Sequence, residues 1–267
     1  MRQPLPVFLL ALAVVGPGSL AMAEDKPAAP ASATAISPPL PIGVEADVYC
    51  TGWIDNVGVV FPASIFSAER VDSKQGLFEG DIVYVSAGTK QGVAAGQEYW
   101  VVRPDRTVYK TGSVLDVLGR VYLTPGRIRV LCAQDDAAIA EIVLSCSDIN
   151  VGDSLLPFEP VPVPLVRRTA PLSSCDPSSG KVSGHIVDDF DSVTAIMKNS
   201  IVYLDLGEED GVMPGDFFSV YRVPSSEYAV RIMLGEASIL TTKRKTSVAI
   251  ITAMRDTMYA GDRVEMK

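Results

Sequence analysis

The chain has 267 residues and a formal net charge of −9. A strongly acidic surface repels phosphate backbones and anionic lipid head groups, which argues against nucleic acid and lipid surfaces as partners. A chain of this length is long enough for one large or two small domains.

The first residues have the pattern of a secretory signal peptide. Met1-Arg2 gives a positive start, Leu5–Val15 is a short apolar run, and Ala21-Met22-Ala23 is a small-x-small cleavage signal. This pattern predicts a signal peptide over residues 1–23, cleaved after Ala23, and export to the periplasm or cell envelope. Because no later apolar run approaches about eighteen residues, we expect no membrane insertion of the mature chain.

Two proline-rich segments divide the remaining chain. Residues 24–43 consist mainly of Ala, Pro and Ser, which cannot build a core, so they predict a disordered tether. Residues 158–174 contain prolines at alternating positions, which excludes a central strand and predicts an extended linker. The linker separates a first unit over 44–157 from a second unit over 175–267.

Both units have the residue pattern of β-structure. Short runs rich in Val, Ile, Tyr and Phe, such as Ile201–Leu204 and Ser247–Met254, are separated by Gly, Asp and Asn. The best helix candidate, Ser64–Val71, would form at most two turns. The sequence therefore predicts an all-β protein of two tandem small β-barrel units, SH3-like or similar.

The two units are related by an internal duplication. Ile82–Arg103 aligns with Ile201–Arg222, and nine of the 22 aligned positions are identical. The alignment then slips by about ten residues, after which Gly126–Asp153 aligns with Gly235–Asp262 without a gap. Both copies end in the same Gly-Asp dipeptide.

The repeated glycines indicate turns between strands. Gly92 and Gly211 lie where a hairpin turn or bulge would need a positive φ, and Gly96 and Gly215 precede the next strand. Because these glycines connect strand to strand, no helix N-terminus is present to hold a phosphate, and we interpret all four as structural.

The shared pattern resembles the C-terminal barrel of the flagellar assembly protein T family and related β-barrel modules that accompany LysM domains in bacterial envelope proteins. The chain has no recognisable LysM segment. The resemblance implies a folding signature rather than a catalytic one. It is carried by Val83, Tyr84, Gly88, Gly92, Val93 and Gly96, by Val202, Tyr203, Gly207, Gly211, Val212 and Gly215, and by the closing pairs Gly152-Asp153 and Gly261-Asp262.

Four cysteines permit disulfides in an exported protein, and three pairings are open. Cys132 and Cys146 flank an expected hairpin that turns near residues 134–136, where Cys146 would lie opposite about residue 124, too far from Cys132. Cys50 opens the first unit and could reach its closing strand at Cys146, which favours a disulfide between these two cysteines. No CxxC motif suggests a redox dithiol or a zinc site.

The sequence offers no recognisable catalytic group. A Ser-His-Asp triad would have to use the one histidine, His185, but the sequence contains no Gly-x-Ser-x-Gly motif for the nucleophilic serine. Asp188, Asp189 and Asp191 could bind calcium through oxygen atoms, but their spacing fits a solvated turn better. We therefore expect no enzyme, no metal and no cofactor.

Candidate partner-binding residues are aromatic or charged. Tyr99-Trp100 and Phe217-Phe218 are assigned to equivalent places, where alternation turns one of each pair outward to stack on a sugar or a protein. The expected hairpin tips differ in charge, which makes Lys90, Glu208 and Glu209 further candidates. We expect Trp53 in a core and Lys243-Arg244-Lys245 at a solvated hairpin tip.

Three functions remain open. The favoured hypothesis is an exported, non-catalytic envelope module that acts in protein–protein assembly or scaffolding with envelope proteins, of the flagellar or envelope-complex accessory type. The alternative is a module that binds cell-wall glycan, that is, peptidoglycan. The third is a hydrolase with unrecognised Ser or Asp groups, which would need a polar pocket with perturbed pKa values.

Overall fold

The structure is a computed structural model, and it describes residues 40–69, 76–166, 173–175, 177–225 and 230–267. Within these residues it consists of strands, one short α-helix and two 3₁₀ turns. The strands form two closed six-stranded antiparallel barrels, which confirms the predicted fold class. The predicted signal peptide and residues 24–39 of the tether lie outside the described residues.

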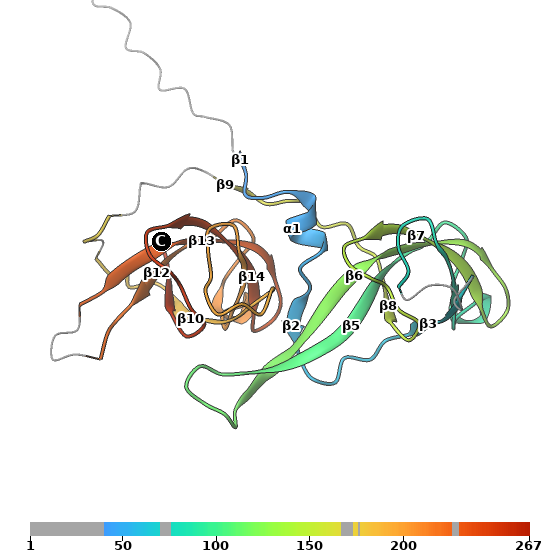
Figure 1. Ribbon diagram of the computed structural model, residues 1–267, viewed down its shortest axis with the longest axis horizontal. Coiled ribbons are helices and arrows are strands. Elements are labelled where there is room, and N and C mark those ends of the chain that lie inside the picture. The colour runs from blue at the N-terminus through green and yellow to red at the C-terminus, as the bar shows by residue number, and fades with distance from the viewer. Residues whose placement is uncertain (1–39, 70–75, 167–172, 176, 226–229) are drawn as a thin grey trace, which may run out of the picture. The chain divides into compact units, whose positions relative to one another are not determined.

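The first barrel is drawn mainly in green in Figure 1. It closes in the order β3-β4-β7-β6-β5-β8, and a further strand, β2, pairs with β6 outside the ring. Its strands are β2 (Trp53–Asp55), β3 (Ala63–Ala68), β4 (Ile82–Val85), β5 (Glu98–Tyr109), β6 (Val117–Ala133), β7 (Ala138–Ser145) and β8 (Ser154–Pro157).

The second barrel, drawn in orange and red, repeats this topology (Figure 1). It closes in the order β10-β11-β14-β13-β12-β15, so that each strand has a counterpart in the first barrel. Its strands are β10 (Ser183–Asp189), β11 (Ile201–Leu204), β12 (Phe217–Arg222), β13 (Ile232–Thr242), β14 (Ser247–Met254) and β15 (Arg263–Met266).

The pairing of strands from the two aligned blocks is the same in both barrels, although the alignment slips between the blocks. In the first barrel Val83 pairs with Ala140, and in the second Val202 pairs with Ala249. Both pairs are the residues that the two aligned blocks place in corresponding positions. The duplication is therefore visible in hydrogen-bonding register as well as in sequence.

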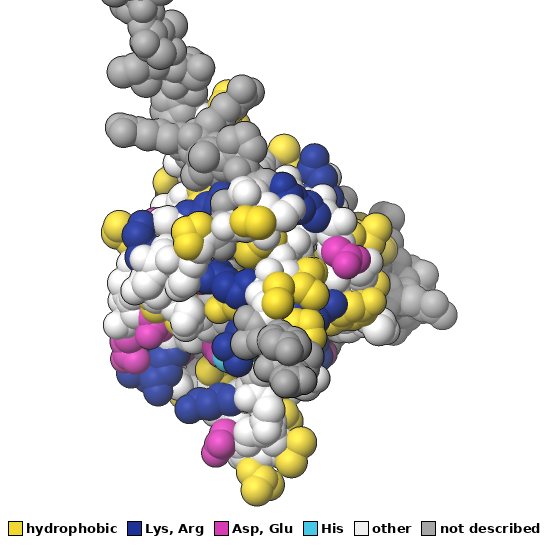
Figure 2. Space-filling model, turned by 90° about the vertical axis from the view of Figure 1, so that its left-hand side faces the viewer, with side chains coloured by type: hydrophobic (Ala, Val, Ile, Leu, Met, Phe, Trp, Pro, Cys, Tyr) yellow, Lys and Arg dark blue, Asp and Glu magenta, His cyan; other side chains and the backbone are white. Residues whose placement is uncertain are grey.

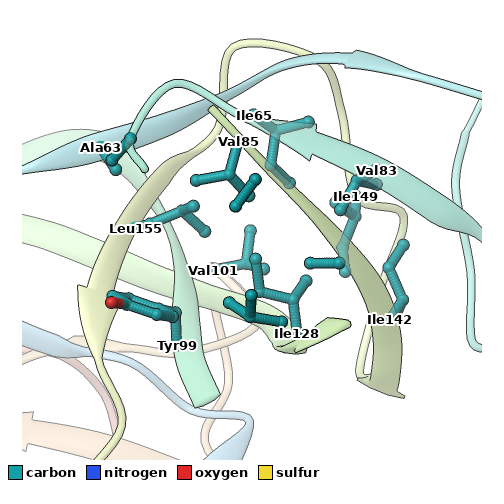
Figure 3. Close-up of a cluster of buried hydrophobic side chains, with 14 of the residues drawn as sticks. Ala63, Ile65, Val83, Val85, Tyr99, Val101, Ile128, Ile142, Ile149 and Leu155 are labelled. Atoms are coloured by element: carbon teal, nitrogen blue, oxygen red, sulfur yellow. The ribbon is translucent and has the colours of Figure 1, made fainter. Parts of the chain in front are cut away.

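Each barrel encloses its own core of alternating inward side chains. Ile65, Val83, Val101 and Leu155 belong to the first core (Figure 3), and Phe218 lies in the second. Residues 64–68 of the helix candidate Ser64–Val71 lie instead in β3, where Ala63 and Ile65 are buried and Phe66 is exposed. The alternation over residues 63–66 is the pattern of a strand with one face in the core, and it slips by one residue where the pairing with β4 is irregular between Ile65 and Ser67.

A third hydrophobic cluster joins the barrels, and residues 38–267 form one compact unit. Within this cluster the Tyr203 hydroxyl donates to the Thr51 carbonyl oxygen at 2.6 Å, and the Thr246 hydroxyl donates to the Ile54 carbonyl oxygen at 2.6 Å. Burial raises the pKa of the Tyr203 phenol. The buried members of the cluster are Val48, Ile54, Val108, Val121, Ile201, Tyr203, Leu240, Val248 and Ile250.

The segments predicted as tether and linker pair with each other where they are described. β1 (Leu40–Pro41) runs antiparallel to β9 (Leu165–Val166), and the Ile42 amide donates to the Pro164 carbonyl oxygen at 3.0 Å. Residues 40–43 are therefore ordered, in contrast to the tether expected there, and the proline-rich linker is partly a strand. The described parts of both segments form a separate two-stranded sheet outside the barrels, in keeping with their prolines.

The helix α1 (Glu45–Tyr49) follows directly and ends in a disulfide. The Asp47 carboxylate accepts the amide proton of Val44, which caps the first turn. Cys50 then bonds to Cys146 with a Cα–Cα distance of 5.5 Å, the pair that the sequence argument favoured. Cys132 and Cys175 are free and exposed.

The strands on either side of the repeated glycines do not form a hairpin. Instead, the 3₁₀ turns η2 (Thr89–Gln91) and η3 (Glu208–Asp210) lead to the far side of the barrel, since β4 pairs with β3 and β7 and not with β5. Gly92 and Gly211 end these turns with φ of 84° and 77°, which favours glycine. Gly96 and Gly215 also have positive φ.

Candidate binding site

The aromatic pairs do not occupy the equivalent places assigned to them. Tyr99 corresponds to Phe218, and both are buried in their barrel cores. Trp100 corresponds to Ser219, while Phe217 corresponds to Glu98. The second aromatic residue therefore follows the buried one in the first barrel and precedes it in the second. Burial raises the pKa of the Tyr99 phenol, whose hydroxyl donates to Gln97 Oε1 at 3.0 Å.

Trp100 is half-buried in an aromatic cluster outside the barrel core. Its ring centroid lies 5.3 Å from that of Tyr49 and 4.7 Å from that of Phe158, at tilted and edge-on angles. The Arg127 guanidinium lies 4.4 Å from the Phe158 centroid, within the range of a cation–π contact. This cluster fixes Trp100 against α1 and the start of the linker.

A pocket of about 360 Å³ opens next to this cluster, between side chains of both barrels and of the linker. It contains both tryptophans of the chain, Trp53 and Trp100. Its volume is near the lower end of the roughly 300–1,000 Å³ typical of ligand pockets. The lining residues are Val48, Tyr49, Gly52, Trp53, Trp100, Thr124, Leu156, Pro157, Glu159, Val161, Pro214, Thr241, Thr242 and Lys243.

Trp53, expected in a core, is partly buried and packs against the third hydrophobic cluster and not inside either barrel. It stacks on Tyr122 at 5.8 Å, and the Lys243 ammonium lies 4.9 Å from the Trp53 ring centroid. Lys243 and Glu159 are the two charged residues among the lining residues, and both are exposed. The pocket therefore has an aromatic and aliphatic lining with one cation and one anion.

The charged turn residues proposed for partner binding have partners within the chain. The Lys90 ammonium lies 2.8 Å from the Asp136 carboxylate, and the Glu209 carboxylate lies 2.7 Å from the Arg244 guanidinium. The Glu208 carboxylate accepts a hydrogen bond from Thr242 at 3.2 Å. Lys90 also lies 3.8 Å from Asp135, and this pair corresponds in the alignment to Glu209 and Arg244 with the charges exchanged. The charge difference between the two turns is therefore matched by an opposite charge difference in the facing hairpins.

An extended hairpin distinguishes the first barrel. Strands β5 and β6 have 12 and 17 residues, whereas β12 and β13 have 6 and 11. The additional residues account for the slip of about ten positions in the alignment and project as a two-stranded arm (Figure 1). Arg106 fixes the base of this arm to β10, donating to Asp188 Oδ2 at 2.7 Å and to the Asp189 carbonyl oxygen at 2.6 Å.

The end of this arm, residues Tyr109–Val117, is the arm tip. Val114 and Leu115 are 83% and 85% exposed there, and Tyr109 and Val117 are 44% and 45% exposed. Hydrophobic side chains gather at the lowest point of the view in Figure 2, at the height where Figure 1 draws the arm. Sequence reasoning missed this feature, although the gap in the repeat alignment marks its position.

Three of the residues that could carry chemistry, His185, Asp188 and Asp189, have partners within the chain. His185 Nδ1 lies 3.2 Å from Asp205 Oδ2, and Asp188 is bonded to Arg106. Asp189 Oδ2 accepts the Val193 amide proton at 2.9 Å, so the acidic run caps a turn rather than gathering around a common point. Among the described residues no group of His, Cys, Asp and Glu has the arrangement of a metal site.

Comparison with known families and with curated proteins finds no match to this chain. No helix among the described residues has the length and apolar character needed to cross a membrane. The candidate site therefore consists of the pocket and the arm tip, both defined by geometry alone.

Proposed function

We propose that this chain is an exported, non-catalytic module of the bacterial cell envelope that acts in protein–protein assembly. The disulfide between Cys50 and Cys146 supports export, because such bonds persist in oxidising compartments. The pattern of residues 1–23 supports the same conclusion. The resemblance of the duplicated barrel to the flagellar assembly protein T family suggests an accessory role in a flagellar or other envelope complex.

The observation that carries the proposal is the arm tip. Val114 and Leu115 extend apolar side chains into solvent from a hydrogen-bonded hairpin whose base is fixed by Arg106. Such a convex shape cannot enclose a small molecule, but it can insert into a cavity on another macromolecule. Exposed apolar groups of this kind are typical of interaction surfaces.

The test is site-specific photo-crosslinking in the native cell. A photoreactive residue at position 115 is expected to capture one or a few envelope proteins, identified by mass spectrometry. The matched control is position 60, because Val60 is also 85% exposed but lies outside the arm. Equal capture at both positions, or no protein captured at position 115, would refute the assembly function.

The pocket favours a second candidate, binding of peptidoglycan glycan. Trp53 and Trp100 both line it, and aromatic faces beside a few polar groups suit sugar rings. This function predicts co-sedimentation with purified peptidoglycan that is lost in Trp100→Ala and retained in Phe217→Ala. Absence of co-sedimentation by the unaltered chain would remove this candidate.

A further inference from the structure

We propose that the arm tip of one copy inserts into the pocket of a second copy, so that this chain assembles head to tail. The inference rests on the proposed assembly function and names its partner as a second copy of the chain. It requires a rigid apolar tip, a pocket of matching character, and compatible charges around both. The chain carries all three.

The arm tip has hydrogen bonds within its own turn. The Lys110 amide donates to the Asp116 carbonyl oxygen at 2.9 Å, and the Ser113 hydroxyl oxygen accepts the Asp116 amide proton at 3.0 Å. These bonds close the turn that carries the exposed Val114 and Leu115. A preorganised tip loses little conformational entropy on binding.

The pocket suits a small aliphatic insert. Val48, Leu156 and Val161 line it together with the two tryptophan rings, and its volume of about 360 Å³ is modest. In the chain itself it is not filled by the arm tip, because Val114 and Leu115 remain 83% and 85% exposed and neither lines the pocket. The arm tip of the same copy is therefore not its occupant, and the proposal places there the arm tip of a second copy.

The charges at the two surfaces are complementary. The arm tip carries one cation and one anion, Lys110 and Asp116, on either side of the apolar pair. The pocket carries one anion and one cation, Glu159 and Lys243. Each surface therefore offers an opposite charge for both charges of the other, Glu159 for Lys110 and Lys243 for Asp116.

Tip and pocket are different surfaces, so the contact is heterologous. Each bound copy still presents one free pocket and one free tip, and assembly continues into a ring or an open filament. A symmetric dimer, in which the same patch meets itself, is a different arrangement. This difference allows a decisive mixing experiment.

The experiment compares three full-length variants by sedimentation velocity. Leu115→Asp damages the tip and leaves the pocket intact, whereas Val161→Glu obstructs the pocket and leaves the tip intact. Val60→Asp is the control for a charge placed on an exposed apolar residue elsewhere. Thermal melting establishes whether each variant is folded. If Leu115→Asp is not folded, substitution of the exposed Val114 by Asp repeats the test of the tip.

The unaltered chain and Val60→Asp are expected to form oligomers larger than dimers at concentrations up to about 100 μM, in the range of weak, reversible interfaces. Leu115→Asp and Val161→Glu are each expected to be monomeric. Their equimolar mixture is expected to form one-to-one dimers and nothing larger, because only one intact tip and one intact pocket remain between them.

Other outcomes overturn the proposal and assign the surfaces differently. A mixture that stays monomeric excludes the tip-in-pocket contact. An unaltered chain that is monomeric throughout excludes self-assembly, but the assembly function stands if position 115 still captures a different envelope protein. A monomeric chain that binds peptidoglycan fragments, with binding lost in Val161→Glu, assigns the pocket to glycan instead.

Discussion

A single polar arrangement recurs at the end of each repeat and explains several of the shared residues. Arg103 donates two hydrogen bonds to the buried Asp153, at 2.8 Å each, and Arg222 donates two to the buried Asp262, at 2.7 Å each. Each carboxylate also accepts a backbone amide proton three residues earlier. In each repeat, the Asp of the closing Gly-Asp pair therefore accepts the hydrogen bonds of the arginine that ends the first aligned block.

Removing either arginine should destabilise the protein by a similar amount. Arg103→Gln and Arg222→Gln each leave a buried carboxylate without its charged donors, and hydrogen bonds to charged groups contribute roughly 1.5–3 kcal/mol. Arg129→Gln is the control, because its ion pair with Glu98 involves a guanidinium that is 50% exposed and should contribute less than about 1 kcal/mol. Urea unfolding measures all three, and equal losses in all three would contradict the prediction.

Glu265 should make stability depend on pH. Burial raises the pKa of this carboxyl, but hydrogen bonds from Ser178 and Arg231 outweigh burial and hold the pKa below its ordinary value of 4.5. A carboxyl with a lowered pKa in the folded state stabilises the protein at pH values above its pKa in the unfolded state. This contribution is lost as the pH falls through its pKa in the folded state.

The comparison of the unaltered chain with Glu265→Gln isolates this contribution. The difference in free energy of unfolding should be largest near about pH 7 and should diminish below about pH 4, where the carboxyl becomes protonated. Chemical denaturation at a series of pH values measures it. A difference that does not change over this range would show that the carboxylate charge is not involved.

At the scale of elements, the repeat predicted the barrels but not the segments between them. The glycines and the alternating Val, Ile and Tyr residues mark strands wherever one face meets a core, so the strand pairs followed from the sequence. The alignment matched Gly88 with Gly207, but the sequence did not show why glycine is needed at position 88. A Cβ there would collide with the Gln134 carbonyl oxygen. Close backbone approaches of this kind depend on tertiary structure.

The helix α1 and the β1–β9 pair were missed because they are too short to carry a period. Their order comes from neighbouring elements: Val48 is buried in the third cluster, and Cys50 is bonded to Cys146 at the end of β7. The hairpin register correctly argued against a bond between Cys132 and Cys146, because Cys146 lies beside Pro125, close to the expected residue 124.

The disulfide should stabilise the chain substantially, because it closes a loop of 96 residues. Constraint of the unfolded state is expected to contribute about 2–4 kcal/mol. Reducing agent should therefore lower the melting temperature of the unaltered chain and leave Cys50→Ser/Cys146→Ser unchanged. Cys132→Ser/Cys175→Ser should behave like the unaltered chain, since both cysteines are free. A melting temperature insensitive to reduction would contradict this account.

At the scale of the whole molecule, identical residues have different environments in the two copies. Tyr84 packs against the exposed Phe66 and is half-buried, whereas its counterpart Tyr203 is fully buried in the third cluster. All four residues of β11 are buried, but those of β4 alternate. Nothing in the local sequence distinguishes the outer faces of these strands, which is why neither the third cluster nor the pocket was predicted.

The third cluster should make the two barrels unfold together. Leu240 and Leu234 lie on the same strand, β13, and both are fully buried, but Leu240 belongs to the third cluster and Leu234 to the core of the second barrel. Substitution of either leucine by Ala should cost about 2–5 kcal/mol. Only Leu240→Ala weakens the contact between the barrels.

Calorimetry separates these two effects. Leu234→Ala should lower the melting temperature while the calorimetric and van't Hoff enthalpies still agree, because the barrels remain coupled. Leu240→Ala should broaden or split the transition, with the calorimetric enthalpy exceeding the van't Hoff value. If both variants split the transition, the barrels unfold as independent domains and the third cluster does not couple them. If neither variant splits it, the coupling comes from other contacts, such as the Arg106 hydrogen bonds and the linker.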